Sequence, residues 1–250
     1  MSMPKLVPEN HVAINEHFAN FTPSERINRF GFAVMHAMCP NDMHYIGGSD
    51  QIIQEHLEAG GNVILAPYHQ SNLDTPTTAS IGCEPPFQLL RGDTIIPAKA
   101  SIFRLPILGR FFPHMGGHPA FRGKDFAKDE AGILLREQCA DGLIQLDIDY
   151  INNGGNVAIF PQGTRDKDIY SLKIPKIRPG IARIALGVND PSKLIIVPAG
   201  IAYRSKFPRP NPVVVINRPF SPAGKSEAEV IELTRAGIQE AKDIAFEIAA

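Results

Sequence analysis

Five short runs of apolar residues, each bounded by glycine or proline, constrain the fold more than any other feature of this sequence. They are rich in valine and isoleucine without polar alternation, as expected of strands that are buried on both faces. The runs are Asn62–Ala66, Thr94–Pro97, Asn156–Phe160, Leu194–Pro198 and Val213–Ile216. Helical patterns separate them, at about Asp50–Glu58, Thr75–Ile81, Asp125–Asn152, Pro179–Leu186 and Ser226–Ala249. This alternation predicts an α/β fold with a largely parallel central sheet flanked by helices.

The length and composition suit one domain. The chain has 250 residues, 44% of them hydrophobic, which is enough for one sizeable core. We expect residues 1–250 to form a single α/β domain, with residues 1–48 as an N-terminal helical segment packed on it. Within that segment, Ile27–Met35 predicts a helix that either packs on the sheet, the simpler interpretation, or lies on a membrane. No apolar run is long enough to span a bilayer.

The cysteines and the charge distribution indicate the cellular compartment and the class of binding partner. Cys39, Cys83 and Cys139 form no disulfide framework, and no signal peptide is visible, so we expect a cytoplasmic protein. With a net charge of −1, the molecule as a whole has no electrostatic attraction for nucleic acid. Residues 165–218, however, carry 11 basic and 3 acidic side chains. This excess favours an anionic partner, such as phosphate head groups, a coenzyme or an acidic carrier, although a solvated basic face is an equal alternative.

Two of the predicted strands are built alike. Each follows a Gly-Gly pair, is stopped by a proline, Pro67 or Pro161, and leads into polar residues. Open α/β sheets bind ligands beyond the carboxyl ends of their strands. We therefore expect both polar clusters, which begin at His69 and Gln162, to lie at that edge of the sheet.

The first cluster contains His69 and Asp74. On one helix these two side chains would point about 140° apart, but on a turn that leaves a strand they can meet. The carboxylate would then accept the imidazole Nδ1–H and leave Nε2 free to act as a general base. The structural alternative is that Asp74 or Thr75 only caps a helix whose first residue is Pro76.

Two further turns carry arginine. Gly163, Thr164 and Arg165 offer backbone N–H groups, a hydroxyl and a guanidinium, which together suit a phosphate. Their plain alternative is a strand end with an exposed arginine. Another glycine-bracketed turn ends in Arg122, and it follows the segment Ala98–Phe112, which mixes basic and large apolar residues in a way that is unusual for a solvated loop.

Taken in order, these blocks resemble the glycerolipid acyltransferase family, which includes the lysophosphatidic acid acyltransferases. His69 and Asp74 match the family's His-x4-Asp block, and Lys99–Arg122 is similar to the second block. Phe160–Arg165 is similar to the block Phe-Pro-Glu-Gly-Thr-Arg, and Ile195–Pro198 resembles the apolar fourth block that ends in proline. The resemblance spans roughly residues 63 to 198.

The resemblance implies an O-acyltransferase of phospholipid biosynthesis. An acyl group would pass from acyl-CoA or acyl carrier protein, as co-substrate, to the hydroxyl of a glycerophosphate-type acceptor, with 1-acylglycerol-3-phosphate as the first expectation. Glycerol-3-phosphate and other lysolipids are alternatives. His69 would be the general base and Asp74 its partner. Arg122, Gly163, Thr164 and Arg165 would bind the acceptor phosphate, and Pro161, Gln162 and Pro198 would line the substrate pocket. No resident cofactor or metal is implied.

The chain departs from the family pattern at two places. Gln162 stands where the family usually has glutamate, so a role that requires that carboxylate is lost. Pro119 and Phe121 differ from the usual Phe-Ile-Asp-Arg ending, which weakens the alignment of Arg122. A lipid- or CoA-binding module that kept the fold but lost turnover is therefore an alternative, and Gln162 is the residue that would indicate it.

Two further interpretations concern a metal site and a membrane. A zinc site of His69, Asp74, His114 and His118 is disfavoured by the glycine pair between the last two histidines. Peripheral contact with an anionic membrane is predicted by the basic stretch at 165–218 and by the apolar run Ile102–Phe112 with its two arginines.

Overall fold

The computed structural model describes residues 3–166, 174–205 and 209–250. Its strands are β1 (Asp42–Tyr45), β2 (Asn62–Pro67), β3 (Thr94–Lys99), β4 (Gly117–Ala120), β5 (Asn156–Ala158), β6 (Leu194–Ser205) and β7 (Asn211–Ile216). Its α-helices are α1 (His11–Ala19), α2 (Glu25–Met38), α3 (Ser49–Glu58), α4 (Asp74–Ile81), α5 (Leu108–Phe111), α6 (Glu130–Asn152), α7 (Gly180–Gly187) and α8 (Glu227–Ala249).

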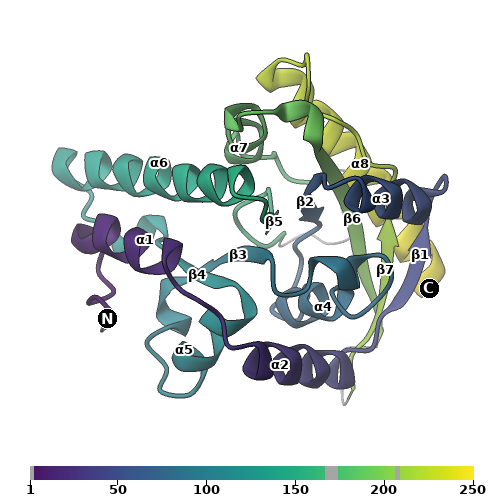
Figure 1. The fold of residues 1–250 in the computed structure, drawn as a ribbon, viewed down its shortest axis with the longest axis horizontal. Helices are drawn as coiled ribbons and strands as arrows, with labels where there is room; N and C mark the ends of the chain where they lie inside the picture. The colour runs from purple at the N-terminus through teal and green to yellow at the C-terminus, as the bar shows by residue number, and fades with distance from the viewer. Residues whose placement is uncertain (1–2, 167–173, 206–208) are drawn as a thin grey trace.

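The described strands form one sheet in the order β1-β7-β6-β2-β5-β3-β4. Strands β2 to β6 run parallel, β7 is antiparallel to β6, and β1 is parallel to β7. Helices flank this sheet (Figure 1). The predicted α/β fold with a largely parallel sheet is therefore confirmed, and β6–β7 is its antiparallel exception.

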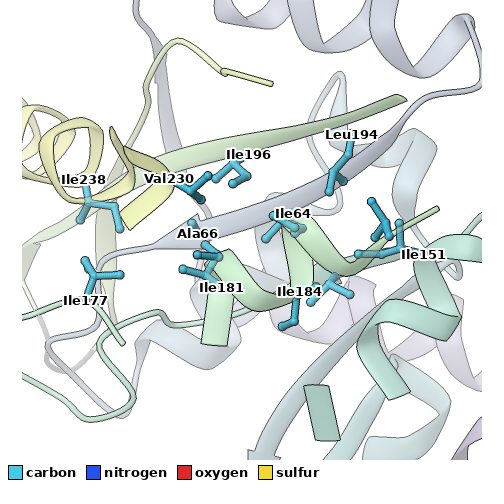
Figure 2. Close-up of a cluster of buried hydrophobic side chains, with 14 of the residues drawn as sticks. Ile64, Ala66, Ile151, Ile177, Ile181, Ile184, Leu194, Ile196, Val230 and Ile238 are labelled. Atoms are coloured by element: carbon cyan, nitrogen blue, oxygen red, sulfur yellow. The ribbon is translucent and has the colours of Figure 1, made fainter. Parts of the chain in front are cut away.

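The central strands are apolar on both faces because both faces are covered. Ile64 and Ala66 of β2 lie in a cluster with Ile181 and Ile184 of α7 and with residues of α6 and α8 (Figure 2). The alternate residues of β2 lie in a second cluster with α3, α4 and the segment that follows α4. Period-two alternation thus places successive β2 side chains in different cores.

The Gly-Gly pairs end α3 and α6 in the same way. Gly60 and Gly154 have φ values of +77° and +88°, the left-handed conformation that glycine adopts at helix ends. A side chain at the following glycine would collide with the ring of His56 after α3 or Tyr150 after α6. Since β2 and β5 are parallel neighbours, these two matched helix ends bring the polar clusters that follow both strands to one edge of the sheet.

Residues 1–48 contain more than the predicted helices. Helices α1 and α2 lie there, and so does β1, an edge strand that the sequence pattern did not predict. The helix predicted over residues 27–35 belongs to α2, which packs against α4 and the β3–β4 connection. Within the described ranges, no helix is long and apolar enough to cross a membrane.

Candidate active site

The structure brings His69 and Asp74 together. His69 follows β2, Asp74 opens α4, and the His69 Nδ1 atom lies 2.9 Å from Asp74 Oδ2. The side chain of Asp74 is fully buried, whereas that of His69 is 14% exposed. The predicted turn between them therefore exists, with the imidazole at the surface of the site and the carboxylate behind it.

Asp74 does not cap a helix. Its Oδ2 atom accepts the backbone N–H groups of Gln70 and Ser71, both at 2.6 Å, in the turn that precedes α4. A capping side chain would instead accept an N–H of the helix's own first turn. The carboxylate thus fixes the 69–74 turn, and it accepts the imidazole Nδ1–H with the same oxygen.

The second carboxylate oxygen of Asp74 is held by Tyr203. The Tyr203 hydroxyl donates to Asp74 Oδ1 at 2.8 Å and lies 3.1 Å from the Thr77 hydroxyl. Burial and the adjacent carboxylate raise the pKa of Tyr203 well above its ordinary value, so the phenol stays protonated and remains a donor. Tyr203 was not predicted from the sequence, because the predicted strand ended at Pro198.

Strand β6 in fact continues to Ser205. Pro198 does not stop the strand. Its carbonyl accepts the Asn217 N–H just past the end of β7, so the N–H group that proline lacks would face the region beyond β7, where few ladder hydrogen bonds are lost. The apolar run through Ala199–Tyr203 was the signal for this extension. Pro198, predicted to line the substrate pocket, is buried in mid-strand against Gly237 of α8.

The imidazole of His69 rests on Phe160. The ring centroids are 4.2 Å apart and the planes are 25° from parallel. With Nδ1 donating to the carboxylate, Nε2 carries the lone pair, and within the described residues it has no hydrogen-bond partner. The ring is thus fixed by stacking and by Asp74, with its basic nitrogen available to a substrate.

Gln162 joins the two clusters. Its Oε1 atom accepts the His69 backbone N–H at 3.1 Å, and the Asp166 N–H donates to the His69 carbonyl at 2.8 Å. A backbone N–H can only donate, so the amide oxygen must face it. Glutamine supplies this acceptor as well as glutamate would, so the departure at Gln162 leaves the support of His69 intact. Gln162 and Pro161 are both buried beside the histidine.

Gly163, Thr164 and Arg165 are exposed just beyond this junction. Gly163 has a φ of +71°, which favours glycine. Its absent Cβ would lie 3.3 Å from Arg178 Cγ, and the Arg178 N–H donates to the Pro161 carbonyl at 2.8 Å. Arg178 therefore adds a second exposed guanidinium to this turn. Arg178 is one of the basic residues counted in the stretch 165–218, but its position beside the site follows only from the fold.

Arg122 lies farther away. It follows β4, which is separated from β2 by β5 and β3, so three strand spacings of about 4.8 Å lie between the two strands. Its backbone N–H donates to Asp125 Oδ2 at 2.7 Å, and its side chain is exposed. No described contact joins Arg122 to Arg165 or to His69.

His114 and His118 lie apart from His69. The His114 Nδ1 atom accepts the Ser24 N–H at 2.9 Å, and His118 is buried with its Nε2 atom 3.4 Å from Asp147. Among the residues that the structure describes, no group of three or more His, Cys, Asp or Glu side chains is arranged to hold a metal ion.

Comparisons with known proteins identify the family. The model of the acyltransferase family matches residues 50–202. The solved structure of the 1-acyl-sn-glycerophosphate (LPA) acyltransferase PlsC from Thermotoga maritima is similar in fold. Its TM-score is 0.53 at 19% identity, over 87% of this chain and 79% of that one. No curated protein sequence matches. Since the family model covers more than half of the chain, including His69, Asp74 and the Phe160–Arg165 block, the protein belongs to the acyltransferase family.

Proposed function

We propose that the protein transfers a fatty acyl group from acyl-CoA or acyl carrier protein to the hydroxyl of a glycerophosphate-type acceptor, with 1-acylglycerol-3-phosphate as that acceptor. The observation that carries the proposal is the free Nε2 of His69, backed by the buried Asp74 carboxylate at 2.9 Å. A base so placed can activate a hydroxyl and then return the proton to a leaving group.

The reaction needs no acyl-enzyme. His69 Nε2 takes the proton of the acceptor hydroxyl as the oxygen attacks the thioester carbonyl carbon. The imidazolium that forms is stabilised by Asp74, whose charge is already in place. The C–S bond then breaks, the sulfur takes the proton from the imidazolium, and the products are an ester and a free thiol.

The exposed turn at Gly163, Thr164 and Arg165 would bind the acceptor phosphate, together with Arg178. This turn is bonded directly to the His69 backbone through Gln162 and Asp166. A phosphate held there is therefore at a fixed distance from the base. Arg122, assigned to the same phosphate by resemblance, contributes only if the phosphate lies between the two turns, because two strand spacings separate β4 from β5, the strand that precedes Gly163.

A panel assay tests this function. Purified protein is incubated with acyl-CoA or acyl carrier protein and with lysophosphatidate, glycerol-3-phosphate or other lysolipids; thiol release and the acylated product are measured. His69→Ala should lower turnover by roughly 10²–10⁴-fold with the fold intact, whereas His17→Ala, which replaces a half-buried histidine of α1, should not. Acyl-CoA binding without thiol release for any acceptor would instead identify a binding module. A fully active, folded His69→Ala protein would exclude the mechanism.

A further inference from the structure

The connection between β3 and β4 exposes a short apolar turn, Leu105–Leu108, here called the apolar turn. Leu105, Ile107 and Leu108 are 48%, 80% and 42% exposed. In the described part of the chain, no other four consecutive residues expose three large apolar side chains. Large apolar groups gathered in this way on a surface mark an interaction site.

The surroundings of the apolar turn are basic. Residues 94–124 contain five basic residues and no acidic one. Arg104 and Arg110 bracket the turn, and both are exposed. The Arg104 Nη2 atom donates to the Leu6 carbonyl at 2.6 Å, which holds that guanidinium beside the turn. An apolar tip between two exposed cations is complementary to a surface that is apolar inside and anionic outside.

Part of the backbone around the apolar turn is hydrogen-bonded within the connection. The N–H groups of Leu105, Gly109 and Arg110 donate to the carbonyls of Ile102, Leu105 and Ile107, and Pro106 has no N–H group. These three N–H groups do not depend on water as a partner, which favours contact with lipid.

The base of the turn is closely packed. A Cβ at Gly109 would lie 2.1 Å from the Phe103 carbonyl oxygen. The ring of Phe103 is buried and makes edge contacts with Phe18 and Phe112. The tip is therefore presented on a fixed support and does not need to be ordered on binding.

We propose that the apolar turn docks the protein on an anionic bilayer, with Leu105, Ile107 and Leu108 entering the lipid and Arg104 and Arg110 at the phosphate groups. A fluid bilayer fits a side chain that protrudes as far as Ile107, whereas a protein partner would need a matching socket. Strands β2, β5, β3 and β4 are parallel, so the connection leaves the sheet at the edge where His69 lies. The use of this orientation to reach lipid substrates rests on the proposed function; the docking itself does not.

Vesicle sedimentation tests the docking. The full chain is mixed with phosphatidylcholine vesicles, with or without phosphatidylglycerol, at low and high salt. Binding should require phosphatidylglycerol and weaken as salt screens the charges. The double variant Ile107→Ser/Leu108→Ser should bind at least about 10-fold more weakly, and Arg110→Gln about 5-fold more weakly. The matched control is Leu233→Ser, an exposed leucine on α8, which Figure 1 shows at the other end of the molecule from α5.

Activity on soluble substrates separates docking from catalysis. With a short-chain acyl-CoA and an acceptor below its micelle concentration, the double variant should turn over like the unmodified protein. Unchanged vesicle binding by the double variant would overturn the proposal, as would an equal loss in Leu233→Ser. Unchanged vesicle binding with a raised KM for acyl carrier protein alone would assign the turn to that acidic carrier instead.

Discussion

The carboxylate of Asp74 has two separable roles, and replacing it in two ways should separate them. Its Oδ2 atom faces three donors, the His69 Nδ1–H and two backbone N–H groups, while Oδ1 faces the Tyr203 hydroxyl. In Asp74→Asn the amide oxygen must face the three donors. The amide nitrogen then faces Tyr203, whose hydroxyl can accept and turn its proton to Thr77. The imidazole should therefore keep its orientation and its tautomer.

The magnitudes differ sharply between the two variants. Asp74→Asn removes only the charge beside the imidazolium, worth about 2–4 kcal/mol at an effective dielectric constant near 20, or roughly 30- to 1000-fold in kcat. It should lower the free energy of unfolding by less than about 1 kcal/mol. Asp74→Ala strands two backbone N–H groups and a phenol inside the protein, at about 1 kcal/mol or more each, so it should lower the free energy of unfolding by about 3 kcal/mol or more.

Urea denaturation and single-turnover thiol release measure these two quantities on the same samples. Asp141→Asn is the control, because it removes a carboxylate from an exposed ion pair with Arg183 and should change neither quantity appreciably. The reasoning fails if Asp74→Asn turns over as fast as the unmodified protein, or if it loses as much stability as Asp74→Ala.

Three further predictions follow from single contacts. Tyr203→Phe should lower kcat by about 10-fold or more with little change in either KM, since it removes a hydrogen bond of roughly 1.5–3 kcal/mol to the Asp74 carboxylate; steady-state kinetics check this. Arg165→Ala and Arg178→Ala should each raise the KM for the acceptor by roughly 10- to 150-fold, and an increase confined to the donor's KM would reassign the turn to the donor. Burial lowers the pKa of His118 from 6.5 to about 4 and raises that of Asp147 well above 3.8. In Asp147→Asn, the free energy of unfolding should therefore fall as the pH drops from 6.5 towards 4, because the unfolded chain binds a proton that folded His118 does not. In the unmodified protein the raised pKa of Asp147 has the opposite effect. Denaturant titrations at several pH values should therefore show a smaller change of the free energy of unfolding with pH for the unmodified protein than for Asp147→Asn.

The sequence predicted the buried strands but not the edge strands. β2, β5 and β6 are apolar because both of their faces are covered, and this composition is visible without a structure. β1 and β4 read Asp-Met-His-Tyr and Gly-His-Pro-Ala. Polar residues and proline are tolerated there because an edge strand needs partners on one side only. Only the register with β7 and β3 identifies them as strands.

The basic stretch at 165–218 does not form one surface. Lys193 immediately precedes β6 and Arg204 lies near its end, so they are about 35 Å apart along the strand. Arg183 pairs with Asp141 on α6, and Arg204 pairs with Asp42. Three basic residues of the stretch, Lys167, Lys173 and Lys206, lie outside the described residues. The sheet therefore separates basic residues that are close in sequence, and among the described ones Arg165 lies on the turn that follows β5 near His69, with Arg178 beside it.

The same distinction between local and distant contacts explains which part of the site could be predicted. His69 and Asp74 are five residues apart, so a single turn brings them together, and the sequence contains everything that this turn requires. Gln162 and Tyr203 reach them from strands that neighbour β2 on either side. Their positions depend on the order of β5, β2 and β6 and on how far β6 extends beyond Pro198, neither of which is encoded near His69. A His–Asp contact can thus be found from its spacing, while the residues that hold it in place require the pairing of strands far apart in the chain.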